Sequence, residues 1–164
     1  MSVDVSTWNI FDKIAVGAGG VIFIFSFISS FVTASVSAGP FAVSNGISAW
    51  NSYAVLGLLL MFAAVALVVL QTMQPTVLPD TAPWPLITAG GAGLGLLLLV
   101  LRAFTYGGGV PSGIGVSVHP GWSGWLVMAA GVVLVAATAI PLTTYRSRVE
   151  DKLNNLGGGS TPSA

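Results

Sequence analysis

The chain has 164 residues, of which 54% are hydrophobic and 6% are charged, and five basic and five acidic side chains give a formal net charge of zero. A soluble domain has about 25% charged residues, so this composition excludes an ordinary water-soluble globule and predicts a protein dissolved in lipid. The absence of cysteine excludes disulfides, thiolate metal sites and cysteine nucleophiles, and the absence of a basic run argues against a nucleic-acid partner.

The first thirteen residues, MSVDVSTWNIFDK, do not have the pattern of a cleavable signal peptide. Asp4 and Asp12 stand where such a peptide would carry positive charge. A short helix through this segment would turn Trp8 and Phe11 toward lipid. We therefore expect residues 1–13 to form an N-terminal interfacial segment.

Four apolar segments follow, each long enough to cross a hydrocarbon core that requires about 20 helical residues. They are residues 14–36, 53–73, 84–101 and 122–142, and none has a charged residue in its interior. Backbone groups in lipid must find their hydrogen-bond partners within their own segment, which favours α-helices. The predicted fold is therefore all-α, an integral membrane bundle of four transmembrane helices.

Small and hydroxyl-bearing residues form a predicted stripe on the first of these segments. Ser26, Ser30 and Thr33 follow the i, i+4, i+7 spacing of one helical face. Such a face packs well against another helix, in this chain or in a partner. We expect this stripe to be a docking face, with a water-lined path as the alternative.

The third segment contains GGAGLG, which is rich in glycine as a phosphate-binding loop is. A phosphate loop needs its glycines between a strand and a helix, whereas these lie inside an apolar span. Gly91 and Gly95 are four residues apart, as are Ala89 and Gly93. This spacing is typical of a helix-packing seam, where small residues allow two helices to approach closely.

Residues 143–164 are predicted to be a charged tail that starts as a helical continuation, with Val149 and Leu153 on one side, and ends in a disordered GGGSTPSA.

The basic residues predict the orientation of the bundle in the membrane. With four spans, Lys13, Arg146, Arg148 and Lys152 lie on the side of the termini, and Arg102 lies alone on the other. The positive-inside rule then predicts a multi-pass protein of the cell membrane with both termini in the cytoplasm.

Three arginines are candidate contacts for lipid phosphate or for a partner's carboxylate: Arg102, Arg146 and Arg148. For Arg102, which ends the third span, the alternative is that it snorkels to the interface and sets the depth of the span.

The polar residues show no pattern expected of a catalytic, cofactor or metal site. His119 is the single histidine and has no nearby cysteine, aspartate or glutamate. Asp80 lies in the loop between the second and third spans, which places it on the opposite side of the membrane from His119. We therefore expect no catalytic residues, no cofactor and no metal.

Three stretches carry a family resemblance: TWNIFDKIAVGAGG at the start, PWPLITAGGAGLGLLLLVLR in the third span and GWSGWLVMAAGVVLVAATA in the fourth. In this layout the chain resembles small four-span integral membrane proteins of actinobacterial type. The resemblance covers most of the chain and rests on composition and layout. It implies the four-helix membrane fold and brings with it no activity and no site residues.

Together these patterns favour a non-catalytic protein, an accessory or scaffolding subunit of a larger membrane complex. Its expected partners are the lipid bilayer and either other membrane subunits or further copies of itself. The alternative is a small transport or channel component that works as an oligomer, with its polar path along the serine stripe. An enzyme or a lipid-binding module is the third possibility.

Overall fold

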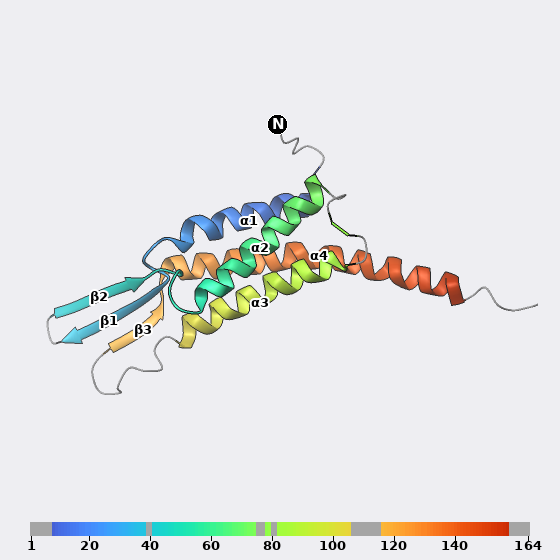
Figure 1. The fold of residues 1–164 in the computed structure, drawn as a ribbon. Helices are drawn as coiled ribbons and strands as arrows, with labels where there is room; N and C mark the ends of the chain where they lie inside the picture. Colours follow the sequence, from blue (N-terminus) through green and yellow to red (C-terminus); the bar gives the residue numbers. More distant parts are fainter. Residues whose placement is uncertain (1–7, 39–40, 75–77, 80–81, 106–115, 158–164) are drawn as a thin grey trace, which may run out of the picture.

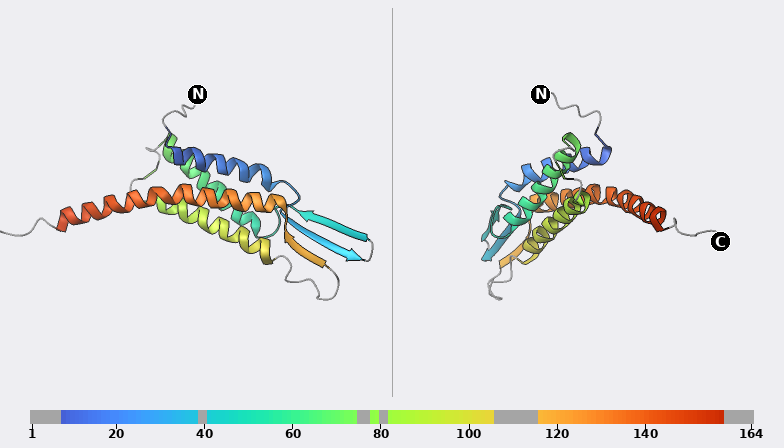
Figure 2. Two further views of the ribbon diagram at one scale, coloured as in Figure 1. Left: turned by 180° about the vertical axis from the view of Figure 1, so that it is seen from behind. Right: turned by 45° about the vertical axis from the view of Figure 1, so that its right-hand side comes forward.

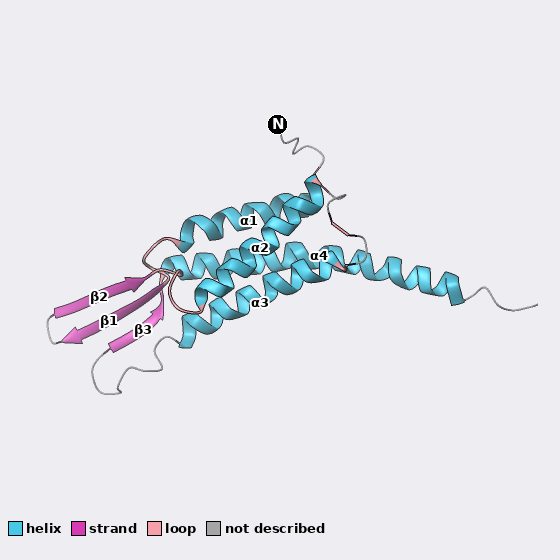
Figure 3. Ribbon diagram, viewed as in Figure 1, coloured by secondary structure: helices cyan, strands magenta, loops and turns pink. Residues whose placement is uncertain are grey.

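A computed structural model describes residues 8–38, 41–74, 78–79, 82–105 and 116–157, with side chains for 8–36, 44–74, 78–79, 82–105 and 117–142. The helices are α1 (Ile10–Ser26), α2 (Ala54–Met73), α3 (Trp84–Thr105) and α4 (Trp122–Gly157). The strands are β1 (Val32–Ala38), β2 (Phe41–Ile47) and β3 (Val116–Pro120). The helices form a bundle, and the strands form a small sheet that extends from one end of it (Figures 1 and 3).

Three of the helices are long and apolar enough to cross a membrane. Their mean hydropathies are 2.6 for Ala54–Met73, 1.9 for Trp84–Thr105 and 2.2 for Trp122–Leu142. They confirm as helices the predicted segments 53–73, 84–101 and 122–142. The first helix, α1, has 17 residues, which is about 26 Å at 1.5 Å per residue, a little less than a hydrocarbon core.

The prediction of one helix over residues 14–36 is wrong, and the fold is not purely all-α. α1 begins at Ile10, where the Asn9 side chain accepts a hydrogen bond from the Phe11 N–H at 3.4 Å, and it ends at Ser26. Residues 27–31 form a turn, and the residues after it, VTASVSA, form β1. Apolar and hydroxyl-bearing residues alternate there with a period of two, which is the pattern of a strand with two different faces.

The sheet has the order β2-β1-β3, with both pairs antiparallel. Val32 pairs with Ile47 on one side and with Pro120 on the other, so the sheet joins the connection after α1 to the connection before α4. Because side chains alternate between faces, Val32, Ala34 and Val36 share one face while Thr33 and Ser35 share the other. Val32 is only 2% exposed and anchors the sheet in the core.

The core lies along the axis of the bundle and receives large side chains from all four helices. α1 packs against α4, α4 against α3 and α3 against α2. The fully buried side chains at these contacts include Ile22, Leu58, Met61, Leu99 and Leu134. Most of the other buried positions in the helices are alanine or glycine, so the helices approach one another closely.

α4 runs past the ends of the other three helices (Figures 1 and 2). It continues without a break through Pro141 to Gly157, so the predicted helical start of the tail is confirmed, while residues 158–164 lie outside the described chain. Proline has no N–H, so the carbonyl of Ala137 lacks the donor that position 141 would otherwise supply.

Candidate functional site

α2 and α3 cross with their backbones in direct contact. A Cβ added at Gly57 would lie 2.8 Å from the carbonyl oxygen of Gly95, and one added at Gly95 would lie 2.7 Å from the carbonyl oxygen of Gly57. Any side chain here would separate the helices. The structure thus places Gly95, one of the four predicted seam residues, at the point of closest approach, with Gly57 as its partner.

The other seam residues lie further from this crossing. A Cβ at Gly91 would come within 3.9 Å of the Leu60 carbonyl oxygen, an ordinary contact, and one at Gly93 would meet nothing within 4 Å. Ala89 is half-buried. The buried face of α3 is instead formed by Thr88, Ala92, Gly95, Leu99 and Ala103.

The predicted stripe of Ser26, Ser30 and Thr33 does not exist as a helical face. Ser26 is the last residue of α1, Ser30 lies in the turn that follows, and Thr33 is in β1. Ser26 is completely buried within the chain. Its hydroxyl donates to the carbonyl of Phe23 at 2.8 Å and accepts from the indole Nε1 of Trp50 at 3.0 Å, so it cannot serve as a docking contact.

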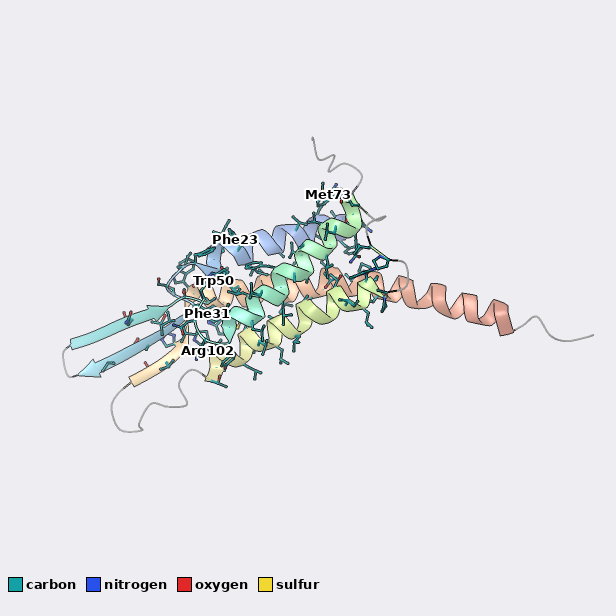
Figure 4. All side chains as sticks on the ribbon, in the orientation of Figure 1. Phe23, Phe31, Trp50, Met73 and Arg102 are labelled. Carbon is teal, nitrogen blue, oxygen red and sulfur yellow. The ribbon has the colours of Figure 1, made fainter. Side chains whose placement is uncertain are left out.

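Trp50 lies in a cluster of aromatic rings near the sheet end of the bundle. Its ring stacks on Phe27 with centroids 5.2 Å apart and lies 6.2 Å from Phe62. Phe23 makes edge-to-face contacts with both phenylalanines, at 5.1 Å and 5.7 Å. The cluster fixes the end of α1 against α2 (Figure 4).

Three glycines close around the turn between α1 and β1, and we call them the glycine clasp: Gly46, Gly121 and Gly124. A Cβ on any of them would overlap a backbone carbonyl oxygen, that of Ser29, Ser30 and Phe31 respectively. Within the clasp, the Phe31 N–H donates to the Ile47 carbonyl and the Gly121 N–H donates to the Phe31 carbonyl, both at 3.0 Å. The clasp fastens the sheet to the start of α4.

Arg102 lies in the last turn of α3 at the sheet end (Figure 4). Its guanidinium carbon is 5.6 Å from the ring centroid of Tyr53, a cation–π distance. The Tyr53 hydroxyl and Thr105 Oγ1 are 2.5 Å apart, which also ties the start of α2 to the end of α3. The backbones of Arg146 and Arg148 belong to α4, but their side chains lie outside the described residues.

His119 lies in β3, exposed, opposite Thr33 of β1. Ser35 of β1 pairs with Ser44 of β2 and with Ser117 of β3, so these side chains share a face with His119. We call this the polar face of the sheet. In the described part of the chain, no group of three or more histidine, cysteine, aspartate or glutamate residues could hold a metal ion.

A cavity of about 80 Å³ lies at the other end of the bundle. All four helices line it, and each contributes one polar side chain: Asp12 from α1, Gln71 from α2, Thr88 from α3 and Thr138 from α4. The sequence offers no local signal for this group, because its members are spread over the whole chain, each within an apolar segment or at its end.

Comparison of the chain with protein-family models, curated proteins and solved structures finds no match. The fold itself therefore defines the class: a helical protein with three helices of membrane-spanning length and a small antiparallel sheet at one end.

Proposed function

We propose that the protein is a non-catalytic, four-span protein of the cell membrane that works as an accessory or scaffolding subunit of a larger membrane complex. In this proposal α1 is the fourth span. Phe23 and Ile24 of α1 and Phe27 directly after it are exposed in the structure, and lipid would cover them as it covers the outer faces of the other helices. A short span is accommodated by local thinning of the bilayer.

The observation that carries the proposal is the sheet, fastened by the glycine clasp and extended beyond the bundle. Trp50 and Arg102 lie where the helices end and the sheet begins. Trp122 is the first residue of α4, and Trp125 contacts Phe104 near the end of α3. Such residues mark a membrane–water interface. Seven residues of strand span about 23 Å, so β1 and β2 reach well into water. The polar face carries hydroxyl groups and one imidazole, a surface suited to contacts between proteins.

The outer edge of β2 has no strand beside it in the described sheet. Unpaired strand edges are sites where another chain can add a strand or lie across the sheet. This edge and the polar face replace the first helix as the proposed docking surface, because the serine stripe is not a helical face.

We expect a photo-crosslinker attached at Ser44→Cys to join the protein to one defined partner in native membranes. The chain has no other cysteine, and Ser44 is exposed on β2. The partner should then co-migrate with the protein in native mass determination after gentle detergent extraction. Leu59→Cys on the exposed side of α2 is the matched control and should label lipid. A protein that travels alone and gives no Ser44 adduct would contradict the subunit proposal, and an adduct with itself would indicate a homo-oligomer.

The four-to-one distribution of basic residues predicts that the sheet is outside the cell and the termini are in the cytoplasm. Cysteines at Ser44 and Ser117 should react with an impermeant thiol reagent in intact cells. A cysteine at Gln74, exposed at the other end of α2, should react only after the membrane is permeabilised. The opposite labelling pattern would invert the topology.

The alternative proposal is a transport or channel component. Its polar path cannot follow the serine stripe, because Ser26, Ser30 and Thr33 do not lie on one helical face. The cavity lined by one polar side chain from each helix is the observation that favours it.

A further inference from the structure

The cavity at the end of the bundle away from the sheet offers oxygen atoms from several helices. Met73, labelled in Figure 4, ends α2 at this end of the molecule. The volume of about 80 Å³ compares with the 10–15 Å³ that one water-sized probe occupies, so there is room for a small ion and a few water molecules. Thr88 and Thr138 are 3% and 5% exposed, and Gln71 is half-buried.

The hydrogen bonds around the cavity use most of the donors and leave several acceptors. Gln71 donates through Nε2 to the Thr88 hydroxyl at 2.9 Å, and Thr88 donates to the Trp84 carbonyl at 2.9 Å. Thr138 donates to the carbonyls of Leu134 at 2.9 Å and Val135 at 3.0 Å. The amide oxygen of Gln71 and the lone pairs of Thr138 therefore remain as acceptors, against the second N–H of Gln71 Nε2 as a donor, a balance that favours a cation.

Asp12 supplies the charge. Within the described residues its carboxylate has no hydrogen bond or ion pair, and the neighbouring Lys13 is exposed and does not line the cavity. α1 and α3 begin here and α2 ends here, so the helix ends together contribute about half a positive charge, which the full negative charge of the Asp12 carboxylate outweighs. The carboxylate therefore decides the sign of the potential. Pro141 adds one more oxygen nearby, since it leaves the Ala137 carbonyl without its usual helical donor.

We infer that this cavity binds a small monovalent cation of the alkali-metal class, represented by Na⁺, with Asp12, Gln71 and Thr138 as its side-chain oxygen ligands. One carboxylate balances one positive charge, and a neutral site is the least costly arrangement in a medium of low dielectric constant. Divalent cations are usually held by more carboxylates, and the described chain has no such cluster. Helices that are broken or that contain freed carbonyls coordinate Na⁺ in other membrane proteins by the same chemistry.

The test is a titration of the purified full-length protein in detergent with NaCl, with choline chloride added to keep ionic strength constant. We expect the melting temperature to rise with Na⁺ and, above the Kd, to keep rising with the logarithm of its concentration c, because a ligand that binds only the folded state stabilises it by RT ln(1 + c/Kd). The broadening of the ²³Na NMR signal should give the same Kd. Asp12→Asn should raise that Kd about tenfold or more, the usual cost of removing a charged ligand.

Matched variants separate binding from folding. Thr138→Val keeps the shape of the side chain and should weaken Na⁺ binding, whereas Thr138→Ser keeps the hydroxyl and should retain it. Asp151→Asn, further along α4, removes the same charge away from the cavity and should change nothing. The inference is overturned if the melting temperature follows ionic strength alone, or if Asp12→Asn keeps the Na⁺ response. A response to ethanolammonium without one to Na⁺ would also overturn it, in favour of a lipid headgroup amine.

Discussion

Replacing Gly124 with alanine should lower the free energy of unfolding by about 3 kcal/mol, a large effect for one methyl group and at the upper end of overpacking costs. The new Cβ would overlap the carbonyl oxygen of Phe31. That carbonyl already accepts the Gly121 N–H, and the Phe31 N–H is bonded to Ile47. The backbone therefore cannot move aside without breaking the hydrogen bonds that fasten the sheet.

The effect can be measured as a change in melting temperature in detergent and by a disulfide between Ser35→Cys and Ser117→Cys. These two residues pair across β1 and β3, at a spacing within the range a disulfide bridges, so the disulfide reports an intact sheet. Gly131→Ala on the same helix is the control. The atoms nearest to its Cβ would be the terminal methyl groups of Leu96 and Met61, each at 2.8 Å, and flexible side chains can shift more easily than backbone. Equal losses in the two variants would show that the clasp has no special role.

Replacing Gly95 with leucine should separate α2 from α3. We expect the free energy of unfolding to fall by about 3 kcal/mol, or the protein not to fold. A Cβ at this position already lies 2.6 Å from Met61 Cγ and 2.7 Å from the Gly57 carbonyl oxygen, and the rest of the leucine would need further space. We expect a lower yield and a broad or early elution peak in size-exclusion chromatography.

Gly93→Leu is the matched control because it adds the same side chain to the same helix. Nothing lies within 4 Å of a Cβ there, so the change should stay within about 0.5 kcal/mol of the wild type. Both variants gain the same apolarity, and insertion into the membrane should be equally favourable in each. A Gly95→Leu protein as stable as Gly93→Leu would show that the backbones of α2 and α3 do not meet at this point.

The helices follow from physical signals that are local in the sequence. The apolar runs predict α2, α3 and the first part of α4 within a few residues, because length and hydropathy alone decide whether a segment can form such a helix. The contact of Gly95 followed from the same local reasoning, since the spacing of small residues is visible along one helix. Its true partner, Gly57, stands alone in a leucine-rich segment and gave no such signal.

The sheet could not be predicted in the same way, because its partners are far apart in the chain. Read alone, residues 32–36 extend the apolar run of α1, and a window of about twenty residues averages their alternation away. A strand there is stabilised by its pairing on both sides, with residues 41–47 and with residues 116–120. The cavity could not be predicted for the same reason. Asp12, Gln71 and Thr138 are far apart in the sequence and line one cavity only after all four helices have packed.

The position of β1 between β2 and β3 also constrains how the protein is made. The hairpin of β1 and β2 leaves the biosynthetic machinery before α2 and α3, whereas β3 follows both of them. One edge of β1 therefore stays unpaired until the connection between α3 and α4, which contains β3, has been synthesised. We expect the final step of assembly to be the arrival of β3 together with the start of α4, which closes Gly121 and Gly124 over a turn formed much earlier. A chain truncated before residue 116 should accordingly be recognised by quality control as unfinished, although most of its helices are already in place.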